Sequence, residues 1–439
     1  MPDHASSADP AVQRQLDRLT MLSPGADILG LGRITELLAR VGDPHLRLPP
    51  VFHVAGTNGK GSTCAFLRAA IEAAGLKAHV YSSPHLVRFN ERIRIAGALI
   101  EDAVLAPLLD EVLSAGGDIG ASFFEVTTAA AFLAFARTPA DACIIEVGLG
   151  GRLDATNVIA HPAITGIAQL GIDHQVFLGD TAEVIAAEKA GIAKPDVPLV
   201  TMAYPEEIAL TVAAIAATRG APVLAEGEAW RWQVQGDRLH YSDANGAVET
   251  PLPALAGPHQ PANLALAIAM LRHQRALTVP EAALARAARA ARWPARMQRL
   301  SPGPLLDMLP AGSELWLDGG HNPAAAAAVS ATLAQVAEGR PVHLILGMLA
   351  NKDAAGLLAP FAGLARSLYA VPVPGHEHHA PARLAEVARE CGIAHVAPAG
   401  DVPSALRSIA AGGGTPVVLI LGSLYLAGTI LDANGELPD

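Results

Sequence analysis

Short apolar runs alternate with longer segments of helical periodicity along most of the chain. The short runs predict β-strands, and the segments between them carry apolar residues at helical spacing and predict α-helices. The run at 142–147 is apolar on both faces, which is typical of a strand in the middle of a parallel sheet. The first half of the chain has predicted strands at 51–54, 78–82, 142–147 and 163–168, and predicted helices at 34–40, 62–76, 101–115, 128–136 and 181–194.

The alternation changes after residue 227 and then restarts. Residues 230–255 predict short antiparallel strands, and helices follow up to residue 291. A Trp-Pro-Ala-Arg connector at 293–296 then precedes a second series of strands and helices that lacks a glycine-rich phosphate turn. We therefore predict an α/β protein with two domains, residues 1–296 and residues 297–439, of which the second is the smaller.

Composition and charge exclude several classes of protein. Of 439 residues, 51% are hydrophobic and 17% are charged, which indicates a compact protein rather than a disordered one. The net charge of −11 argues against a general nucleic-acid surface. The longest uncharged run, 412–431, is broken by glycines and a proline, so it predicts a strand and a helix rather than a membrane span. The N-terminus has no apolar segment of the signal-peptide type, and we expect a cytoplasmic protein.

A glycine-rich turn joins the first strand to its helix. Glycines let a phosphate approach main-chain N–H groups, and the helix N-terminus adds donors and partial positive charge. Lys60 supplies a charge for the outer phosphates, but Gly61 has no hydroxyl with which to hold Mg²⁺. A turn that binds nothing is the alternative. The turn consists of Gly56, Thr57, Asn58, Gly59, Lys60, Gly61 and Ser62.

Three polar side chains follow other predicted strands and could supply the missing metal ligand. They are Ser83, Glu146 and His174. The carboxyl ends of parallel strands meet at one edge of a sheet, where α/β proteins place their ligands. A carboxylate in a buried strand is costly unless it is paired or bound to a metal. Each residue also has an ordinary explanation, namely a turn for Ser83, a salt bridge for Glu146 and a structural role for His174.

Two further segments carry candidate substrate chemistry. Ser122, Phe123, Phe124 and Glu125 open a helix, and there a ring could stack on a flat heterocycle that the carboxylate binds by hydrogen bonds. Core packing is the alternative for the two aromatic rings. In the second domain, Asp318 and His321 lie between a strand end and a helix start, which suits the binding of an amino acid. Arg296 lies in the connector, where it could bring a cation to a site.

An ordered series of motifs resembles the folylpolyglutamate synthase/dihydrofolate synthase family of the Mur ligase superfamily. The series covers nearly the whole chain: GTNGKGS, SSPHL, NERIR, FFE, EVGLGGRLDATN, GIDH, EKAGI, the helix with Asn263, PARMQ, DGGHNP, LGMLANKD and GSLYL. The resemblance implies a P-loop domain like the central domain of Mur ligases, followed by a smaller, Rossmann-like α/β domain. It also implies an ATP-dependent ligase that joins L-glutamate to dihydropteroate and adds further glutamates to reduced folates.

The resemblance also implies roles for individual residues. ATP is expected at Thr57, Asn58, Gly59, Lys60, Gly61, Ser62, Asn263, Arg296 and Asp318. Two Mg²⁺ ions are expected at Ser83, Glu146 and His174, and substrates at Asp27, Gly30, Ser122, Phe123, Phe124, Glu125, Leu153, Asp154, Ala155 and Ser423. Catalytic roles are expected for Lys60, His321 and Lys189, and the last of these is expected to carry a carbamate.

The expected reaction passes through an acyl phosphate, because a carboxylate is a poor acyl donor until ATP phosphorylates it. We expect a monomer whose partners are small molecules, without nucleic acid or membrane. Two alternatives stay open at this point. One is a Mur-type ligase for another acid, although the chain has only about fifty residues before the glycine-rich turn and no room there for a nucleotide-sugar domain. The other is an ATP-binding regulator without catalysis.

Overall fold

The computed structural model describes residues 5–22 and 29–439, so the predicted substrate residue Asp27 lies outside the described residues. The chain forms two compact units. The first contains residues 1–254, 260–292 and 439, and the second contains residues 255–259 and 293–438. The short segment 255–259 therefore belongs to the second unit although its neighbours on both sides belong to the first. Our division into functional domains at residue 296 stays a prediction.

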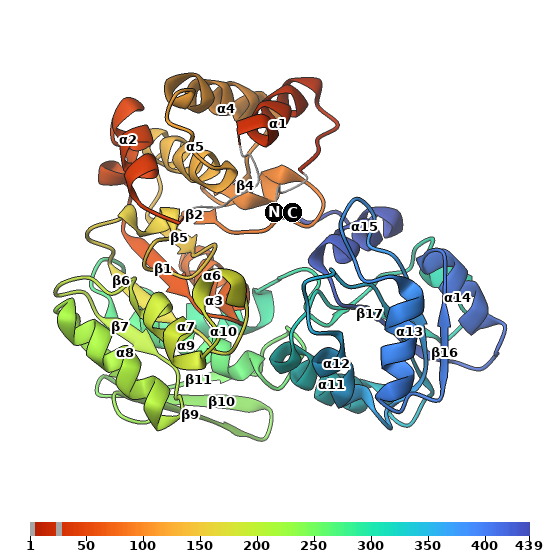
Figure 1. The fold of residues 1–439 in the computed structure, drawn as a ribbon. Helices are drawn as coiled ribbons and strands as arrows, with labels where there is room; N and C mark the ends of the chain where they lie inside the picture. The colour runs from red at the N-terminus through yellow and green to blue at the C-terminus, as the bar shows by residue number, and fades with distance from the viewer. Residues whose placement is uncertain (1–4, 23–28) are drawn as a thin grey trace. The chain divides into compact units, whose positions relative to one another are not determined.

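An eight-stranded sheet forms the centre of the first unit, in the order β4-β3-β2-β5-β1-β6-β7-β8 (Figure 1). Neighbouring strands run parallel except for the pairs β2–β3 and β3–β4. The strands are β1 (Val51–Ala55), β2 (Ala78–Tyr81), β3 (Ile93–Ile95), β4 (Ala98–Leu99), β5 (Ala142–Glu146), β6 (Ile164–Ile167), β7 (Leu199–Thr201) and β8 (Val223–Ala225). The central position of β5 confirms the interpretation of its two apolar faces.

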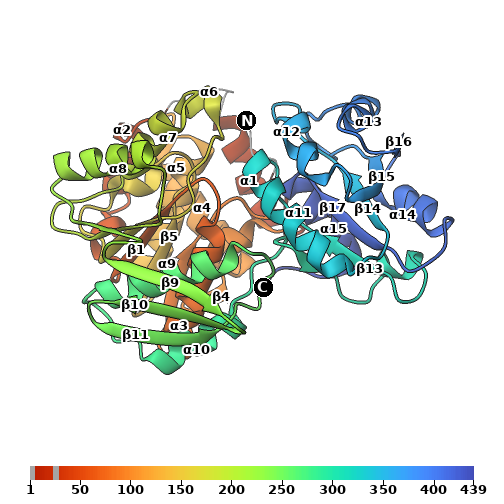
Figure 2. The same cartoon turned by 90° about the horizontal axis from the view of Figure 1, so that it is seen from below.

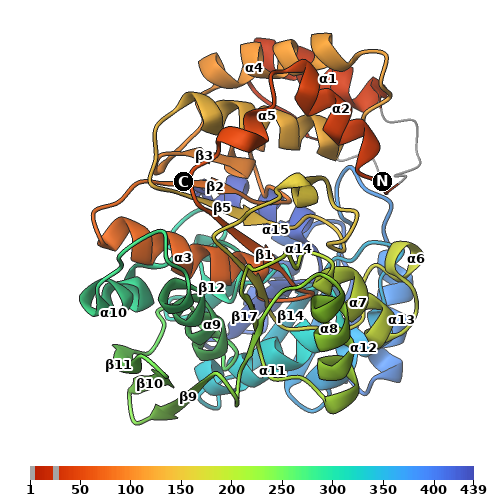
Figure 3. The ribbon, with the colours of Figure 1, turned by 90° about the vertical axis from the view of Figure 1, so that its left-hand side faces the viewer.

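Helices cover both faces of this sheet. One face packs against α1 (Pro10–Leu22), α2 (Gly32–Arg40), α4 (Asp102–Gly116) and α5 (Phe123–Arg137), and beside them α7 (Ala182–Ala190) and α8 (Glu206–Thr218). The opposite side carries α3 (Lys60–Ala73), α9 (Gln260–His273) and α10 (Glu281–Ala290). Figure 3 separates the group of α1, α2, α4 and α5 from the group of α3, α9 and α10. The helices thus lie on the faces of the sheet, and the loops at its carboxyl edge are where α/β proteins place their ligands.

The predicted antiparallel strands at 230–255 form a small sheet, and this sheet packs on α9 and α10 (Figure 2). It consists of β9 (Trp230–Gln235), β10 (Arg238–Asp243) and β11 (Gly246–Pro251). Its contact with α9 includes an ion pair, since Arg272 Nε donates to Asp243 Oδ2 at 2.8 Å. The four-residue helix α6 (Gln175–Leu178) lies in the connection between β6 and α7.

The second unit is built on a six-stranded sheet in the order β12-β13-β17-β14-β15-β16, parallel except at β12–β13. Its strands are β12 (Gln298–Arg299), β13 (Glu314–Leu317), β14 (Val342–Leu346), β15 (Ala365–Ala370), β16 (His395–Pro398) and β17 (Val417–Leu421). Its helices are α11 (Pro323–Ala337), α12 (Ala354–Leu358), α13 (Pro381–Glu390), α14 (Val402–Ala410) and α15 (Leu424–Asn434). Two α/β units with mostly parallel sheets confirm the predicted fold class.

Candidate active site

The glycine-rich turn follows β1 directly and leads into α3. The Thr57 and Asn58 N–H groups both donate to the Gln169 carbonyl, at 2.8 and 3.1 Å. The Thr57 hydroxyl donates to the Gly171 carbonyl at 2.9 Å and accepts from the Gly171 N–H at 3.1 Å. The turn is therefore held in shape by the segment that follows β6.

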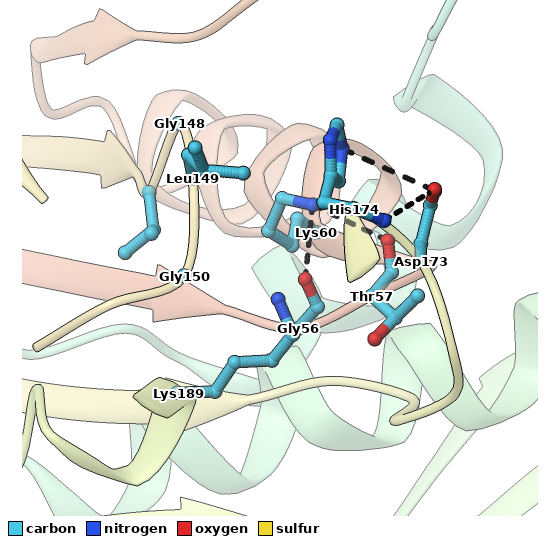
Figure 4. Close-up of a pocket in the computed structure, with 10 residues that line it drawn as sticks. Gly56, Thr57, Lys60, Gly148, Leu149, Gly150, Asp173, His174 and Lys189 are labelled. Atoms are coloured by element: carbon cyan, nitrogen blue, oxygen red, sulfur yellow. Dashed lines mark hydrogen bonds and ion pairs between the residues drawn. The ribbon is translucent and has the colours of Figure 1, made fainter. Parts of the chain in front are cut away.

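The Lys60 ammonium lies over the turn. It donates to the Gly56 carbonyl at 3.0 Å and to the Thr57 carbonyl at 3.3 Å. Figure 4 shows its side chain turned back toward Gly56. The positive charge is thus held beside the main chain where the sequence predicts phosphate binding.

Asn263 comes from α9, about two hundred residues further along the chain, and packs against the same turn. Its side chain is buried, and Nδ2 donates to Gln260 Oε1 at 3.1 Å. Gly59 has a left-handed φ of +84°, and a Cβ on it would lie 2.4 Å from Asn263 Oδ1. The close approach of Asn263 therefore requires glycine at position 59.

Gly59→Ala tests this packing, with Gly75→Ala as a matched control. Gly75 has nearly the same φ, +82°, but a Cβ added there would meet no atom of the described residues within 4 Å. We expect both variants to lose about 1–2 kcal/mol of stability from the left-handed conformation. Only Gly59→Ala should also weaken ATP binding, by more than about tenfold. Equal ATP affinity in the two variants, measured by calorimetry, would contradict the assigned role of the turn.

A pocket opens above the turn and joins four separate segments of the chain. It brings together Thr57, Lys60, His174 and Lys189, all of which the sequence singled out (Figure 4). His174 has a φ of +54° and is half-exposed, and its main-chain N–H donates to Asp173 Oδ1 at 2.8 Å. The pocket is lined by Gly56, Thr57, Lys60, Val147, Gly148, Leu149, Gly150, Asp173, His174 and Lys189.

Lys189 lines this pocket and is buried, with 5% of its surface exposed. Burial lowers the pKa of its ammonium to about 7, and the charge of Lys60 adds to that effect, while Asp173, Asp154 and Glu188 oppose it. Within residues 5–22 and 29–439, no hydrogen bond or ion pair holds the ammonium. Its helix is held by the Arg152 N–H, which donates to the Glu188 carbonyl at 2.8 Å. A lysine in this state is available as a neutral amine near neutral pH.

Ser83 and Glu146 lie at the carboxyl ends of β2 and β5, but they do not line the pocket. The strand order β2-β5-β1-β6 places Ser83, Glu146, the glycine-rich turn and His174 in one row. Glu146 is 5% exposed, and its charge raises the pKa of the nearby Cys64 thiol, second to burial. In the part of the chain that the structure describes, no three His, Cys, Asp or Glu side chains form a ready-made metal cluster.

The segment 122–125 opens α5, and its polar side chains bind one another. Ser122 Oγ accepts from the Glu125 N–H at 3.2 Å, and Glu125 Oε2 accepts from the Ser122 N–H at 2.7 Å. The same Oε2 accepts from Arg33 Nε at 3.0 Å. The Oε2 atom of Glu125 is thus committed to the helix start and to Arg33. Arg33 stands three residues after Gly30, and the sequence predicts no role for it.

The two phenylalanines of this segment have different surroundings. Phe123 is buried against Phe89, with ring centroids 5.9 Å apart, and the Arg92 guanidinium lies 5.4 Å from its ring centre. Phe124 is half-buried, 5.9 Å from the Tyr81 ring, and lies so close to Gly148 that a Cβ there would be 2.3 Å from its ring. Phe124 is therefore the aromatic residue that reaches the pocket loop.

Asp154 binds its own loop. Its Oδ2 accepts from the Leu149 N–H at 2.8 Å, and its Oδ1 accepts from the Thr156 N–H at 3.0 Å. Burial raises the pKa of this carboxyl, and those donors oppose the rise. Leu153 is half-buried beside it, and Ala155 is buried at the start of a short 3-10 turn, Ala155–Val158.

The predicted residues of the second unit gather near the ends of β13 and β17. The Asp318 carboxylate accepts from the Met297 and Gly320 N–H groups, at 2.8 and 2.7 Å. Arg296 Nη1 would lie 3.2 Å from a Cβ on Gly319, so this guanidinium lies beside the residue that follows Asp318. His321 Nδ1 lies 3.3 Å from the Gly319 carbonyl. Ser423 Oγ accepts from the Tyr425 N–H at 3.2 Å and caps α15.

Known proteins resemble the chain over nearly its whole length. Residues 306–424 match the family described as Mur ligase, glutamate ligase domain. The dihydrofolate synthase/folylpolyglutamate synthase of Escherichia coli strain K12 is 37% identical over 79% of this chain and 78% of its own.

None of the helices in the described residues is long and apolar enough to cross a membrane.

Two solved structures have the same fold. Escherichia coli FolC in complex with DHPP and ADP superposes with a TM-score of 0.85 at 33% identity, covering 97% of each chain. A bifunctional folylpolyglutamate synthase/dihydrofolate synthase with Mn, AMPPNP and L-glutamate bound has a TM-score of 0.84 at 33% identity, covering 97% of this chain and 99% of that one. This chain is a member of the folylpolyglutamate synthase/dihydrofolate synthase family of Mur ligases.

Proposed function

We propose that this protein uses ATP to join L-glutamate to dihydropteroate, and that it adds further glutamates to reduced folates. The observation that carries the proposal is the pocket that joins the glycine-rich turn, Lys60 and the buried Lys189. Membership of the family supports the same reaction, because its relatives bear the names of the two synthases and one solved relative holds L-glutamate with a nucleotide analogue.

The reaction requires the acid to be activated. A carboxylate oxygen of dihydropteroate attacks the γ-phosphorus of ATP, ADP leaves, and an acyl phosphate forms. The neutral amine of glutamate then attacks the acyl carbon, phosphate leaves with the former carboxylate oxygen, and the amine loses a proton. Lys60 stabilises the charge on the transferring phosphoryl group, while the N–H groups of the turn bind the other phosphates.

Ser83, Glu146 and His174 fit a divalent cation in donor chemistry, since a hydroxyl, a carboxylate and an imidazole are all metal ligands. We propose that these three hold two Mg²⁺ ions together with the phosphates of ATP. When bound, the ions would neutralise phosphate charge and orient the γ-phosphoryl group. A manganese ion in a solved relative supports a divalent metal in this family.

We also propose that Lys189 carries a carbamate. The neutral amine attacks CO₂, a nitrogen–carbon bond forms, one proton is released, and a carboxylate replaces the ammonium. Burial in the pocket and the neighbouring charge of Lys60 both disfavour an ammonium at this position. The modification would reverse the sign of the charge there and supply oxygen ligands next to the phosphate site.

The roles proposed for Asn263, Arg296 and Asp318 in nucleotide binding follow the resemblance, and the packing of Asn263 against Gly59 supports the first of them. We further propose a catalytic role for His321 and a substrate-binding role for Ser423. A cytoplasmic location and a monomeric state stay predictions.

Phe124→Ala tests the proposed acid pocket, with Phe123→Ala as its matched control. Phe124 is half-buried and lies on Gly148, so we expect the KM for dihydropteroate to rise about tenfold while the KM for ATP changes little. Phe123 is 8% exposed and packs in the core, so its loss should cost about 3–5 kcal/mol of stability. If Phe124→Ala raised both KM values alike, the ring would not belong to the acid pocket.

Isotope transfer tests the proposed reaction. Dihydropteroate labelled with ¹⁸O in its carboxylate should pass one labelled oxygen to the released phosphate. Mass spectrometry of the phosphate reports this directly. Unlabelled phosphate, formed together with the amide product, would exclude the acyl phosphate.

A further inference from the structure

A chain of hydrogen bonds connects three buried polar side chains, His53, Thr156 and Asp154, to the loop that lines the pocket. His53 lies in β1, three residues before Gly56, and is fully buried between β5 and β6. Its Nε2 is 2.9 Å from Thr156 Oγ1, and the Thr156 hydroxyl in turn bonds to Asp154 Oδ1. Asp154 then accepts the Leu149 N–H at 2.8 Å. Leu149 lines the pocket, as Figure 4 shows.

The direction of each hydrogen bond in this chain follows from chemistry. A carboxylate only accepts, so the single hydroxyl hydrogen of Thr156 goes to Asp154. Thr156 Oγ1 can then only accept from His53, which places the imidazole hydrogen on Nε2. Burial lowers the pKa of His53 to about 3, and the charge of Lys194 adds to this. The ring is therefore neutral and donates this one hydrogen bond at any pH near neutrality.

Burying this imidazole in a central strand costs free energy, which suggests that the imidazole has a function. Within the described residues, His53 Nδ1 is buried and has no hydrogen-bond partner. An aliphatic side chain would fill a central strand without that cost. In the described part of the chain, the imidazole makes one hydrogen bond, and it joins the ring to Thr156 in the loop 148–157.

The loop that this chain holds carries several parts of the proposed site. Leu149 lines the pocket, Gly148 contacts Phe124, and a Cβ on Gly151 would lie 2.8 Å from the carbonyl of Glu188, the neighbour of Lys189. A displacement of Asp154 would move the Leu149 backbone and loosen this packing.

We infer that His53 and Thr156 are positioning residues for the acid substrate: they hold the Asp154 carboxylate so that it fixes the Leu149 backbone at the pocket. The identity of the acid rests on the proposed function. Asp154 organises the loop in this arrangement, because both of its oxygens accept hydrogen bonds from loop residues.

His53→Leu and Thr156→Val remove the hydrogen bonds between these side chains and replace each with an apolar side chain. Each should raise the KM for dihydropteroate about tenfold, the factor expected from one lost buried hydrogen bond, and leave the KM for ATP within about twofold. His53→Gln is the matched control, because its amide nitrogen can reach the position of Nε2 and donate to Thr156. It should restore most of the lost affinity.

The double variant His53→Leu with Thr156→Val tests the connection itself. Both substitutions break the same chain of hydrogen bonds. We therefore expect the double variant to raise the KM for dihydropteroate by clearly less than the product of the two single-variant factors. Independent effects that multiply would overturn the inference, and so would a His53→Gln variant as impaired as His53→Leu.

Hydrogen exchange provides a readout that does not depend on the substrate. In the intact protein, peptides covering residues 147–157 should exchange about tenfold faster in His53→Leu and Thr156→Val than in wild type or His53→Gln. Unchanged exchange in this segment would overturn the inference even if the enzyme is active. If the wild type has no activity with dihydropteroate, the proposed function fails. The exchange result still decides whether His53 and Thr156 hold the loop in place.

Discussion

Lys189→Ala should be nearly inactive, and a short carboxylic acid such as formate or acetate should restore part of the activity. The reason is that the variant lacks the proposed carbamate, and a small acid can occupy the vacated space in the pocket. The matched control is Lys194→Ala. Lys194 is the neighbouring half-buried lysine, with a pKa lowered to about 8 by burial, and its Nζ donates to the Asn157 carbonyl at 2.9 Å without lining the pocket.

Lys194→Ala should keep most of the activity and gain nothing from added acids. An active Lys189→Ala enzyme, with intact-mass spectra showing an unmodified wild-type lysine, would contradict the proposal. Equal rescue of both lysine variants would contradict it as well, because the acids would then act elsewhere.

The pH dependence of carbamate formation follows from the lowered pKa. At an ordinary pKa of about 10.4, only about a thousandth of the amine is neutral at pH 7.5, whereas at a pKa of about 7 roughly three quarters is neutral. CO₂ reacts with the neutral form, so at one fixed concentration of dissolved CO₂ the reactivation of CO₂-depleted enzyme should be fast at pH 8 and should slow as the pH falls through 7. Reactivation that is faster at pH 6 than at pH 8, at the same dissolved CO₂, would contradict this expected direction of the pH dependence.

Lys60→Ala should lower kcat by roughly 10²–10³, the usual loss for one preorganised group that stabilises developing charge. The ammonium already lies at the turn, bonded to the Gly56 and Thr57 carbonyls, so little rearrangement is needed for it to meet a phosphate. Steady-state kinetics with saturating ATP separates this effect from weaker binding.

Lys60→Arg is a useful companion because it keeps the charge but not its compact shape. We expect it to recover part of the binding of ATP and little of kcat. A folded Lys60→Ala variant that turns over at a nearly normal rate would remove Lys60 from the chemistry.

The sequence predicted the fold class and the glycine-rich turn well, because both depend on local patterns. Apolar runs and helical periodicity identify strands and helices, and glycines next to a lysine before a helix identify a phosphate turn. Strand order is not a local property. The sequence groups Ser83, Glu146 and His174 at strand ends, but their order along the edge comes from the structure, which places β5 between β2 and β1.

Residues far apart in the chain were the hardest to relate. Asn263 contacts Gly59 through the packing of α9 on α3, and no pattern near either residue indicates this contact. The burial of Lys189 likewise depends on the loop that packs against its helix, since Gly151 allows that loop to approach Glu188 closely.

The segment 122–125 carries a helix-capping pattern as well as candidate substrate chemistry. Ser122 and Glu125 have the spacing of a capping box, and the structure contains one. Adjacent helical residues point about 100° apart, so Phe123 and Phe124 could not both face one ligand from the same side. Helix geometry alone therefore separates the core residue from the one beside the pocket loop.

Substrate dependence of ADP formation tests the central claim most directly. Purified protein is incubated with ATP, Mg²⁺, dihydropteroate and L-glutamate, and ADP and the amide product are both measured. The account predicts one ADP for each amide formed, and almost no ADP when either dihydropteroate or glutamate is omitted. ADP release at the same rate without glutamate, or ADP without any amide, would contradict it.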